Sequence, residues 1–208
     1  MTRYKSWLLA FFVLFATASC IRPPYPEQLP LQHIPTVIVI VGLLTIKKLK
    51  SLSNTGFTLF LLFMTLHVIG ARYIYSYVPY DVWCKSMFGF TLKDALSLTR
   101  NDYDRLVHFS YGLLMLYPLR ELLLRYSNAS ATFANYVSVE FIMASSMLYE
   151  LFEWFIAEIL SPQNAEAYNG QQGDPWDSQK DMASALLGAL VALVIILIRR
   201  KRLQSTPR

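Results

Sequence analysis

The sequence predicts an all-α membrane protein, a polytopic bundle of about six transmembrane helices with both termini in the cytoplasm. Hydrophobic residues make up 54% of the chain and charged residues only 16%, a composition too apolar for an ordinary soluble domain. The apolar residues gather in six stretches, and each approaches the roughly 20 residues that a helix needs to cross a bilayer core of about 30 Å. Lys and Arg fall in every second loop between these stretches, as expected for loops that stay in the cytoplasm.

The six predicted spans follow one another along the whole chain. They cover residues 7–21, 29–46, 57–79, 106–124, 133–160 and 182–198. The second span is the least secure, because it contains Gln32, His33 and Pro35. The basic clusters that orient the spans are Arg3 and Lys5, then Lys47, Lys48 and Lys50, then Arg120 and Arg125, and finally Arg199, Arg200, Lys201 and Arg202. No internal repeat is visible, so residues 1–208 are predicted to form a single integral membrane domain.

The first span has a second interpretation, as a cleaved secretory signal. It has a charged start, a short apolar centre and small residues, and Cys20 follows Ala18 and Ser19 as in a lipoprotein processing site. Thr17, however, stands where such sites prefer Leu. Removing this segment would leave five spans and would still satisfy the distribution of basic loops, so both interpretations stay open.

Charge and cysteine content exclude some classes of function. The net charge of +5 comes from short clusters between apolar runs, so the lipid bilayer is the expected partner and nucleic acid is not. Cys20 and Cys84 lack the CxxC spacing of a metal-thiolate site, although a disulfide between them could form on an oxidising face.

Ionisable residues from several spans are predicted to share one layer near the outer surface. A charge at the centre of a span costs roughly 2.5 to 3.5 kcal/mol on insertion scales, so such groups usually face a partner, water or a site. His108 follows Asp104 by one helical turn, and Glu150 and Glu153 share a face at i,i+3 spacing. The predicted polar pocket consists of Arg72, Asp104, Arg105, His108, Glu150, Glu153, Asp174, Asp177, Lys180 and Asp181.

The segment NGQQGDPWDSQKDM, at residues 169–182, opens the last span. Asp174 suits an N-cap, Pro175 suits the first helical position, and Asp177 complements the helix dipole. Asp181 has no such explanation, because it repels Asp177 at i,i+4 spacing. Arg72, Arg105 and Lys180 could neutralise these acids in a structural network. Alternatively, the acids could hold a proton, a divalent metal or a cationic headgroup.

Three functions are compatible with this layer. The first is an outward-facing pocket that binds a lipid headgroup or another envelope component without chemistry. The second is a membrane-embedded hydrolase or transferase, with or without a divalent metal as cofactor. His108 or Glu150 would act as base, and Asp177 with Asp181 would hold a metal or orient the substrate. The third is a proton-coupled transporter using Glu150 and Glu153, although six spans without a repeat are few for such a protein.

The enzymatic alternative names specific candidates. The catalytic candidates are His108, Glu150, Glu153, Asp177 and Asp181, and the metal-ligand candidates are His108, Glu153, Asp177 and Asp181. No compact metal motif such as HExxH is present. No nucleophile is evident either, since Cys84 lies in a loop and Ser110 faces away from His108. The loop at residues 80–99 is predicted to form a short interfacial helix, either as a lid over the pocket or as a simple connector.

The segments NDYDRLVHFSYGLL, YPLRELLLR, YELFEWFIAEI and NGQQGDPWDSQKDMASALLGAL are similar to signature segments of the YjdF-like family of bacterial inner-membrane proteins. The resemblance covers residues 30–198 and implies a polytopic inner-membrane protein without an established reaction. Its matching positions are Arg72, Asp104, Arg105, His108, Glu150, Glu153, Gly173, Asp174, Trp176, Asp177, Gln179, Lys180 and Asp181. The order of acidic, basic and His residues also resembles the VanZ-like membrane proteins in architecture, which suggests a role in the envelope.

Overall fold

The computed structural model describes the backbone of residues 1–159 and 170–205, and this part of the chain is helical without any strand. The all-α prediction is therefore confirmed. The helices are α1 (Arg3–Ser19), α2 (Leu29–Thr45), α3 (Lys47–Lys50), α4 (Asn54–Tyr73), α5 (Tyr80–Phe88), α6 (Leu92–Leu96), α7 (Tyr103–Tyr126), α8 (Ala131–Ile159) and α10 (Asp177–Ser205).

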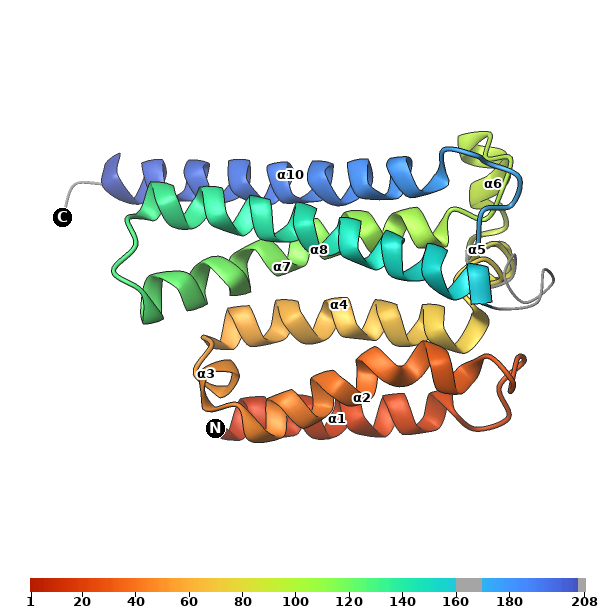
Figure 1. Cartoon of the computed structure of the whole chain (residues 1–208), viewed down its shortest axis with the longest axis horizontal. Helices are drawn as coiled ribbons and strands as arrows, with labels where there is room; N and C mark the ends of the chain where they lie inside the picture. Colours follow the sequence, from red (N-terminus) through yellow and green to blue (C-terminus); the bar gives the residue numbers. More distant parts are fainter. Residues whose placement is uncertain (160–169, 206–208) are drawn as a thin grey trace.

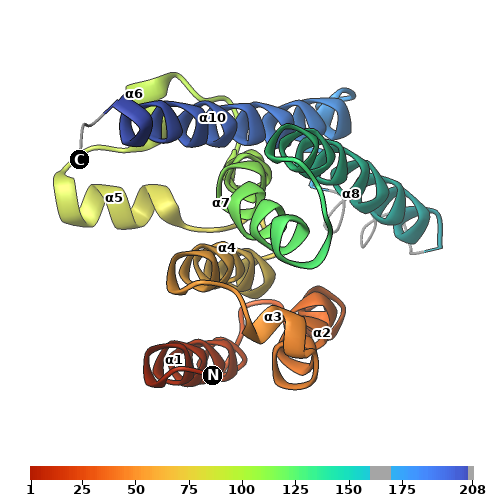
Figure 2. The ribbon, with the colours of Figure 1, turned by 90° about the vertical axis from the view of Figure 1, so that its left-hand side faces the viewer.

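The long helices run along one common direction, with both chain termini at the same end of the bundle (Figure 1). The short helices α5 and α6 lie at the opposite end, beside the loop that leads into α10. Helices α4 and α7 pack against each other in the middle. Helices α1 and α2 pack on α4, while α8 and α10 pack on α7 (Figure 2).

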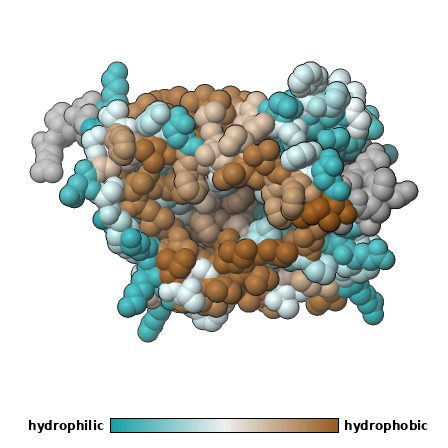
Figure 3. All heavy atoms as spheres, viewed as in Figure 1, coloured by the Kyte–Doolittle hydropathy of each residue, from teal (hydrophilic) through white to brown (hydrophobic). Residues whose placement is uncertain are grey.

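Apolar side chains cover the outside of the bundle between its two ends. Figure 3 shows hydrophobic residues across the middle of one face and hydrophilic residues gathered toward the ends. Large side chains such as Trp7, Phe11 and Phe155 are more than half exposed. This distribution is the one expected of a protein whose middle faces lipid rather than water.

Among the described residues, two helices are long and apolar enough by themselves to cross a membrane, namely α4 and residues Asp177–Arg202 of α10, while α2 is apolar but shorter. The number of six spans and the cytoplasmic position of the termini stay predictions. The shared end of the two termini agrees with an even number of crossings (Figure 1). Residue 160, the predicted end of the fifth span, lies outside the described residues.

The third span ends earlier than the predicted residue 79. Helix α4 stops at Tyr73, because Ile74 and Tyr75 adopt positive φ angles of 51° and 40° and reverse the chain. The Tyr75 ring then folds back onto Gly70, where an added Cβ would lie 2.6 Å from the ring. The phenol of Tyr75 forms a hydrogen bond with Nδ1 of His67. Apolar composition alone does not reveal this turn.

Helices α7 and α10 approach each other closely through small residues. A Cβ added to Gly112 would overlap the carbonyl oxygen of Ala185, and one added to Gly188 would overlap the carbonyl oxygen of Phe109. Buried Ala189 continues the small stripe along α10. Where lipid supplies no hydrophobic drive for helix association, such close backbone contact is a main source of packing energy. This contact fixes α10 against α7, and so places the acids of α10 beside those of α7.

The outer connector contains two short helices rather than the single predicted one. Gly89, with φ of 80°, ends α5, and Thr91 caps α6 by accepting a hydrogen bond from the Asp94 amide at 3.1 Å. Neither helix has a buried residue, so both lie on the surface of the bundle.

Candidate functional site

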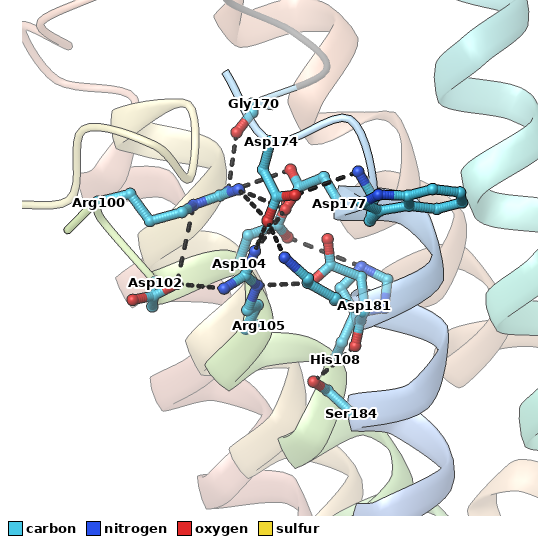
Figure 4. Close-up of polar contacts among 12 residues, drawn as sticks. Arg100, Asp102, Asp104, Arg105, His108, Gly170, Asp174, Asp177, Asp181 and Ser184 are labelled. Carbon is cyan, nitrogen blue, oxygen red and sulfur yellow. Dashed lines mark hydrogen bonds and ion pairs between the residues drawn. The ribbon is translucent and has the colours of Figure 1, made fainter. Parts of the chain in front are cut away.

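Arginines and carboxylates at the end of α7 and α10 away from the chain termini form an ion-pair network, shown in Figure 4. We call it the outer ion-pair network after the predicted position of this end. Its members are Arg100, Asp102, Arg105, Asp174, Asp177 and Lys180. Arg105 donates to Asp102 at 3.0 Å, to Asp174 at 2.6 Å and to Asp177 at 3.1 Å. Arg100 donates to both carboxylate oxygens of Asp177, with Nη2 at 3.1 Å from Oδ2. Paired planar contacts of this kind favour Arg over Lys.

Arg100 also holds the loop that precedes α10. Its guanidinium donates to the carbonyl oxygens of Gly170 at 2.9 Å and Gln171 at 3.0 Å. Beside it, the Gln172 side chain accepts from the Asn101 amide and donates to the Asn101 carbonyl, both at 2.9 Å. The network therefore fastens the loop across the outer end of α7.

Asp174 lies at the edge of this network and is held ionised. The hydrogen bond from Lys180, at 2.6 Å, is the main reason that the pKa of Asp174 falls to about 2, and the Trp176 amide and Arg105 add to it. The prediction that Asp174 is the N-cap of the last helix is wrong, because α10 begins three residues later, at Asp177. Asp174 caps the preceding turn instead, by accepting from the Trp176 amide at 3.1 Å.

Deeper in the bundle lies a buried acid-histidine cluster, which consists of Asp104, His108, Glu150, Glu153 and Asp181. Each of these residues is at most 6% exposed. Nε2 of His108 lies 3.2 Å from Oε1 of Glu150 and 3.7 Å from Oδ1 of Asp104. The other ring nitrogen, Nδ1, lies 3.3 Å from the Ser146 hydroxyl. Asp181 approaches Arg105 at 4.0 Å, which joins this cluster to the outer ion-pair network.

A cavity of about 250 Å³ lies against the acid-histidine cluster. We call it the lateral cavity, because it opens between α2 and α8 on the hollowed face of Figure 3, with α4 and α7 behind it (Figure 2). Its lining is mainly apolar and comprises Pro35, Val39, Phe63, Met64, His67, Tyr75, Asp104, Val107, His108, Tyr111, Ser145, Ser146 and Tyr149. A pocket of about 40 Å³ shares Pro35 and Tyr149 with it and extends along the same two helices.

Nine of the ten residues predicted for the polar pocket lie in the outer ion-pair network or the acid-histidine cluster, and Arg72 does not. Its guanidinium turns toward the end of α1, where it donates to the carbonyl oxygens of Ser19, Ile21 at 3.0 Å and Arg22 at 3.3 Å. The spacing along α4 places Arg72 at the outer level, but only packing decides that it faces α1. The prediction that Arg72 neutralises the acids is therefore wrong.

Arg100 takes that role and was missed in the sequence. It belongs to a loop predicted to lie outside, where basic residues are disfavoured. An arginine two residues before Asp102 in such a loop is a usable signal of a local ion pair. Ser146 was missed as well, and no local signal marks it, because it looks like one more helical serine until α7 is placed beside α8.

The predicted metal ligands do not converge. Within residues 1–159 and 170–205, no three His, Cys, Asp or Glu side chains are arranged so that they could hold a metal ion. Asp177, one of the four candidates, accepts hydrogen bonds from Arg100 and Arg105.

The fold and the site define a helical membrane protein with an ion-pair network at one end of the bundle and a mainly apolar cavity in its side. The chain belongs to the family described as Predicted membrane protein (DUF2238), whose model matches residues 4–202. It is 36% identical over 164 residues to the Inner membrane protein YjdF of Escherichia coli (strain K12). The aligned residues cover 78% of this chain and 74% of that relative. No solved structure matches. The protein is thus an inner-membrane protein of a family without an assigned activity.

Proposed function

We propose that this inner-membrane protein binds a single-chain amphiphile, a lipid or lipid-like envelope component, in the lateral cavity. The observation that carries the proposal is the polarity of the cavity wall. Asp104 and His108 stand on one side of a largely apolar space that opens toward the lipid. A headgroup with hydroxyl or ammonium donors would face the Asp104 carboxylate, and the chain would lie against Val39, Phe63 and Met64.

The outer end of the bundle is a poorer binding site than the lateral cavity. Three cations, Arg100, Arg105 and Lys180, are matched there by Asp102, Asp174 and Asp177. These groups are occupied by each other and by the loop before α10. The outer ion-pair network thus acts as a structural clamp, and it leaves the side of the bundle as the route to the acid-histidine cluster.

The size of the lateral cavity limits the ligand. Pockets for drug-sized ligands measure roughly 300 to 1,000 Å³, so a cavity of about 250 Å³ holds a headgroup and the first part of one chain. The rest of the chain would leave between α2 and α8 and stay in the bilayer. A two-chain phospholipid would have to leave one chain wholly outside.

Photocrosslinking tests the proposal. The probe is an ether-linked monoalkylglycerol that carries a diazirine near its headgroup, and the adducts are mapped by peptide mass spectrometry. We expect adducts on residues of α2, α4 and α8 that line the cavity. Met64→Trp, which fills the cavity, should abolish these adducts. Leu62→Trp, on the exposed face of the same helix, should retain them. Adducts spread evenly over the lipid-facing surface, or unaffected by Met64→Trp, would refute the proposal.

A further inference from the structure

The Ser146 hydroxyl in the wall of the lateral cavity contacts His108, a residue that can act as its base. Ser146 and Glu150 lie one turn apart on α8, at i,i+4 spacing, and both face the ring of His108 on α7. The Ser146 hydroxyl lies 3.3 Å from Nδ1, and Oε1 of Glu150 lies 3.2 Å from Nε2. The three residues are 3%, 6% and 6% exposed. The imidazole therefore stands between a hydroxyl and a carboxylate.

We assign the tautomer of His108 from its neighbours. An ionised carboxylate only accepts hydrogen bonds, so we place the ring proton on Nε2, which Glu150 and Asp104 both approach. With this assignment Nδ1 is the acceptor, and the Ser146 hydroxyl donates a hydrogen bond to it. Oε1 of Glu150 is near Nε2 without an aligned hydrogen bond to any described residue.

Ser146 differs in this respect from neighbouring serines of α8. The hydroxyl groups of Ser138 and Ser145 donate to carbonyl oxygens of their own helix, Ala134 at 2.7 Å and Phe141 at 2.6 Å. That is the ordinary use of a serine inside a helix. The contact of Ser146 is instead with a histidine 38 positions away in the sequence. An activated nucleophile typically consists of a serine that contacts a base, with the base oriented by a third group. Ser146, His108 and Glu150 have this arrangement.

The position of the three residues suits a substrate that arrives from the lipid. Ser146 and His108 line the lateral cavity, whereas Glu150 is not part of its lining and lies behind the histidine. Tyr111 also lines the cavity, and its hydroxyl is 2.6 Å from that of Ser145. The Ser145 hydroxyl already donates to its own helix, so the Tyr111 hydroxyl is the group that could turn to donate a hydrogen bond to an oxyanion formed near Ser146.

We propose that Ser146 is the nucleophile of a membrane-embedded esterase, with His108 as general base and Glu150 as the residue that positions it. The proposal rests on the binding of an amphiphile in the lateral cavity, and it names the substrate class as carboxylic esters of single-chain lipids. The Ser146 oxygen attacks the ester carbonyl carbon and its proton passes to Nδ1 of His108. The ester bond breaks, the leaving alcohol takes that proton, and the acyl group stays on Ser146. Water then attacks the acyl-serine, with its proton passing through Nδ1 back to Ser146, and a carboxylic acid leaves.

A fluorophosphonate probe tests the nucleophile directly, because it phosphonylates activated serines. We expect the purified protein to be labelled, with the adduct on the peptide that contains Ser146. Ser146→Ala should remove the label and also the hydrolysis of a monoacylglycerol in detergent micelles. Ser138→Ala is the matched control, a buried serine of the same helix away from the cavity, and it should retain both. No label on the folded protein, or equal label on Ser146→Ala, would overturn the proposal.

The proposed roles of His108 as general base and Glu150 as positioning residue are tested by the rate of fluorophosphonate labelling. His108→Gln should slow labelling by roughly 100-fold, the low end of what a general base contributes. Glu150→Gln should slow it as well, whereas Glu150→Asp should recover part of the rate, because a carboxylate is restored. Equal rates for Glu150→Gln and Glu150→Asp would show that the carboxylate charge does not position His108. Gel filtration of each variant establishes that the protein is folded.

The photocrosslinking probe separates this inference from the proposed function, because its ether bond cannot be hydrolysed. Ser146→Ala should still be crosslinked in the cavity. Cavity adducts without fluorophosphonate labelling would leave the binding function standing and refute the esterase. Labelling of Ser146 without cavity adducts would support the nucleophile and refute the proposed lipid site.

Discussion

Replacement of Arg100 by Ala is the most informative test of the outer ion-pair network. The side chains of Arg100 and Asp177 are 7% and 3% exposed, so the substitution removes one of the cations that neutralise a buried carboxylate. Removing one partner of a buried pair typically costs about 3 to 5 kcal/mol. Arg105 still donates to Asp177 at 3.1 Å, so we expect the low end, about 3 kcal/mol. That is a loss of roughly 100-fold in the folding equilibrium.

Unfolding by SDS in mixed micelles, followed by tryptophan fluorescence, measures this free energy. Lys180→Ala is the control, because Lys180 is half exposed and its loss should have a much smaller effect. A double-mutant cycle of Arg100→Ala with Asp177→Asn isolates the pair, and we expect a coupling energy of about 2 kcal/mol. If Arg100→Ala is no worse than Lys180→Ala, or if the coupling is near zero, Arg100 is not what holds α10 and its loop in place.

Three further predictions concern packing, pH and topology. Gly188→Ala should lower the free energy of unfolding in the SDS titration by about 1 to 3 kcal/mol, because the new methyl group meets backbone atoms of α7. Gly42→Ala is the control and should not lower it, because the nearest atom to its new methyl group is 3.5 Å away. The depressed pKa of Asp174 stabilises the fold above the ordinary value of 3.8, and that contribution fades as the pH falls toward 2. Lys180→Met should therefore reduce the thermal unfolding temperature more at pH 5 than at pH 2, and an equal reduction would contradict the pairing. Cys84, on the outer connector, should react with a membrane-impermeant maleimide in spheroplasts, and reaction only after lysis would contradict the predicted topology.

Several features of the fold follow from local sequence patterns. Long apolar runs must form helices in a bilayer, because hydrocarbon offers no partner to backbone amides. The i,i+4 spacing of Asp104 and His108, and the i,i+3 spacing of Glu150 and Glu153, place each pair on one helical face wherever that face points. The buried acid-histidine cluster could therefore be anticipated from charged residues at matching heights in different spans.

Other features depend on which face of a helix meets which neighbour. Their predicted height in the membrane makes Arg72 and Arg100 equally plausible partners for the acids. Only the packing of α4 on α1 shows that Arg72 contacts the end of α1 instead. The pairing of Ser146 with His108 depends on the crossing of α7 and α8. Nothing within either segment marks this serine as different from Ser138 or Ser145.

The sequence by itself determined the helical class of this protein, its place in the membrane and the residues too polar to face lipid, because those properties come from single helices and their solvent. The tertiary structure alone decided that the outer acids are clamped by Arg100, that the cavity opens sideways between α2 and α8, and that Ser146 contacts His108 in its wall. Those outcomes depend on contacts between helices, such as the close approach at Gly112 and Gly188, and no periodicity within one segment specifies them.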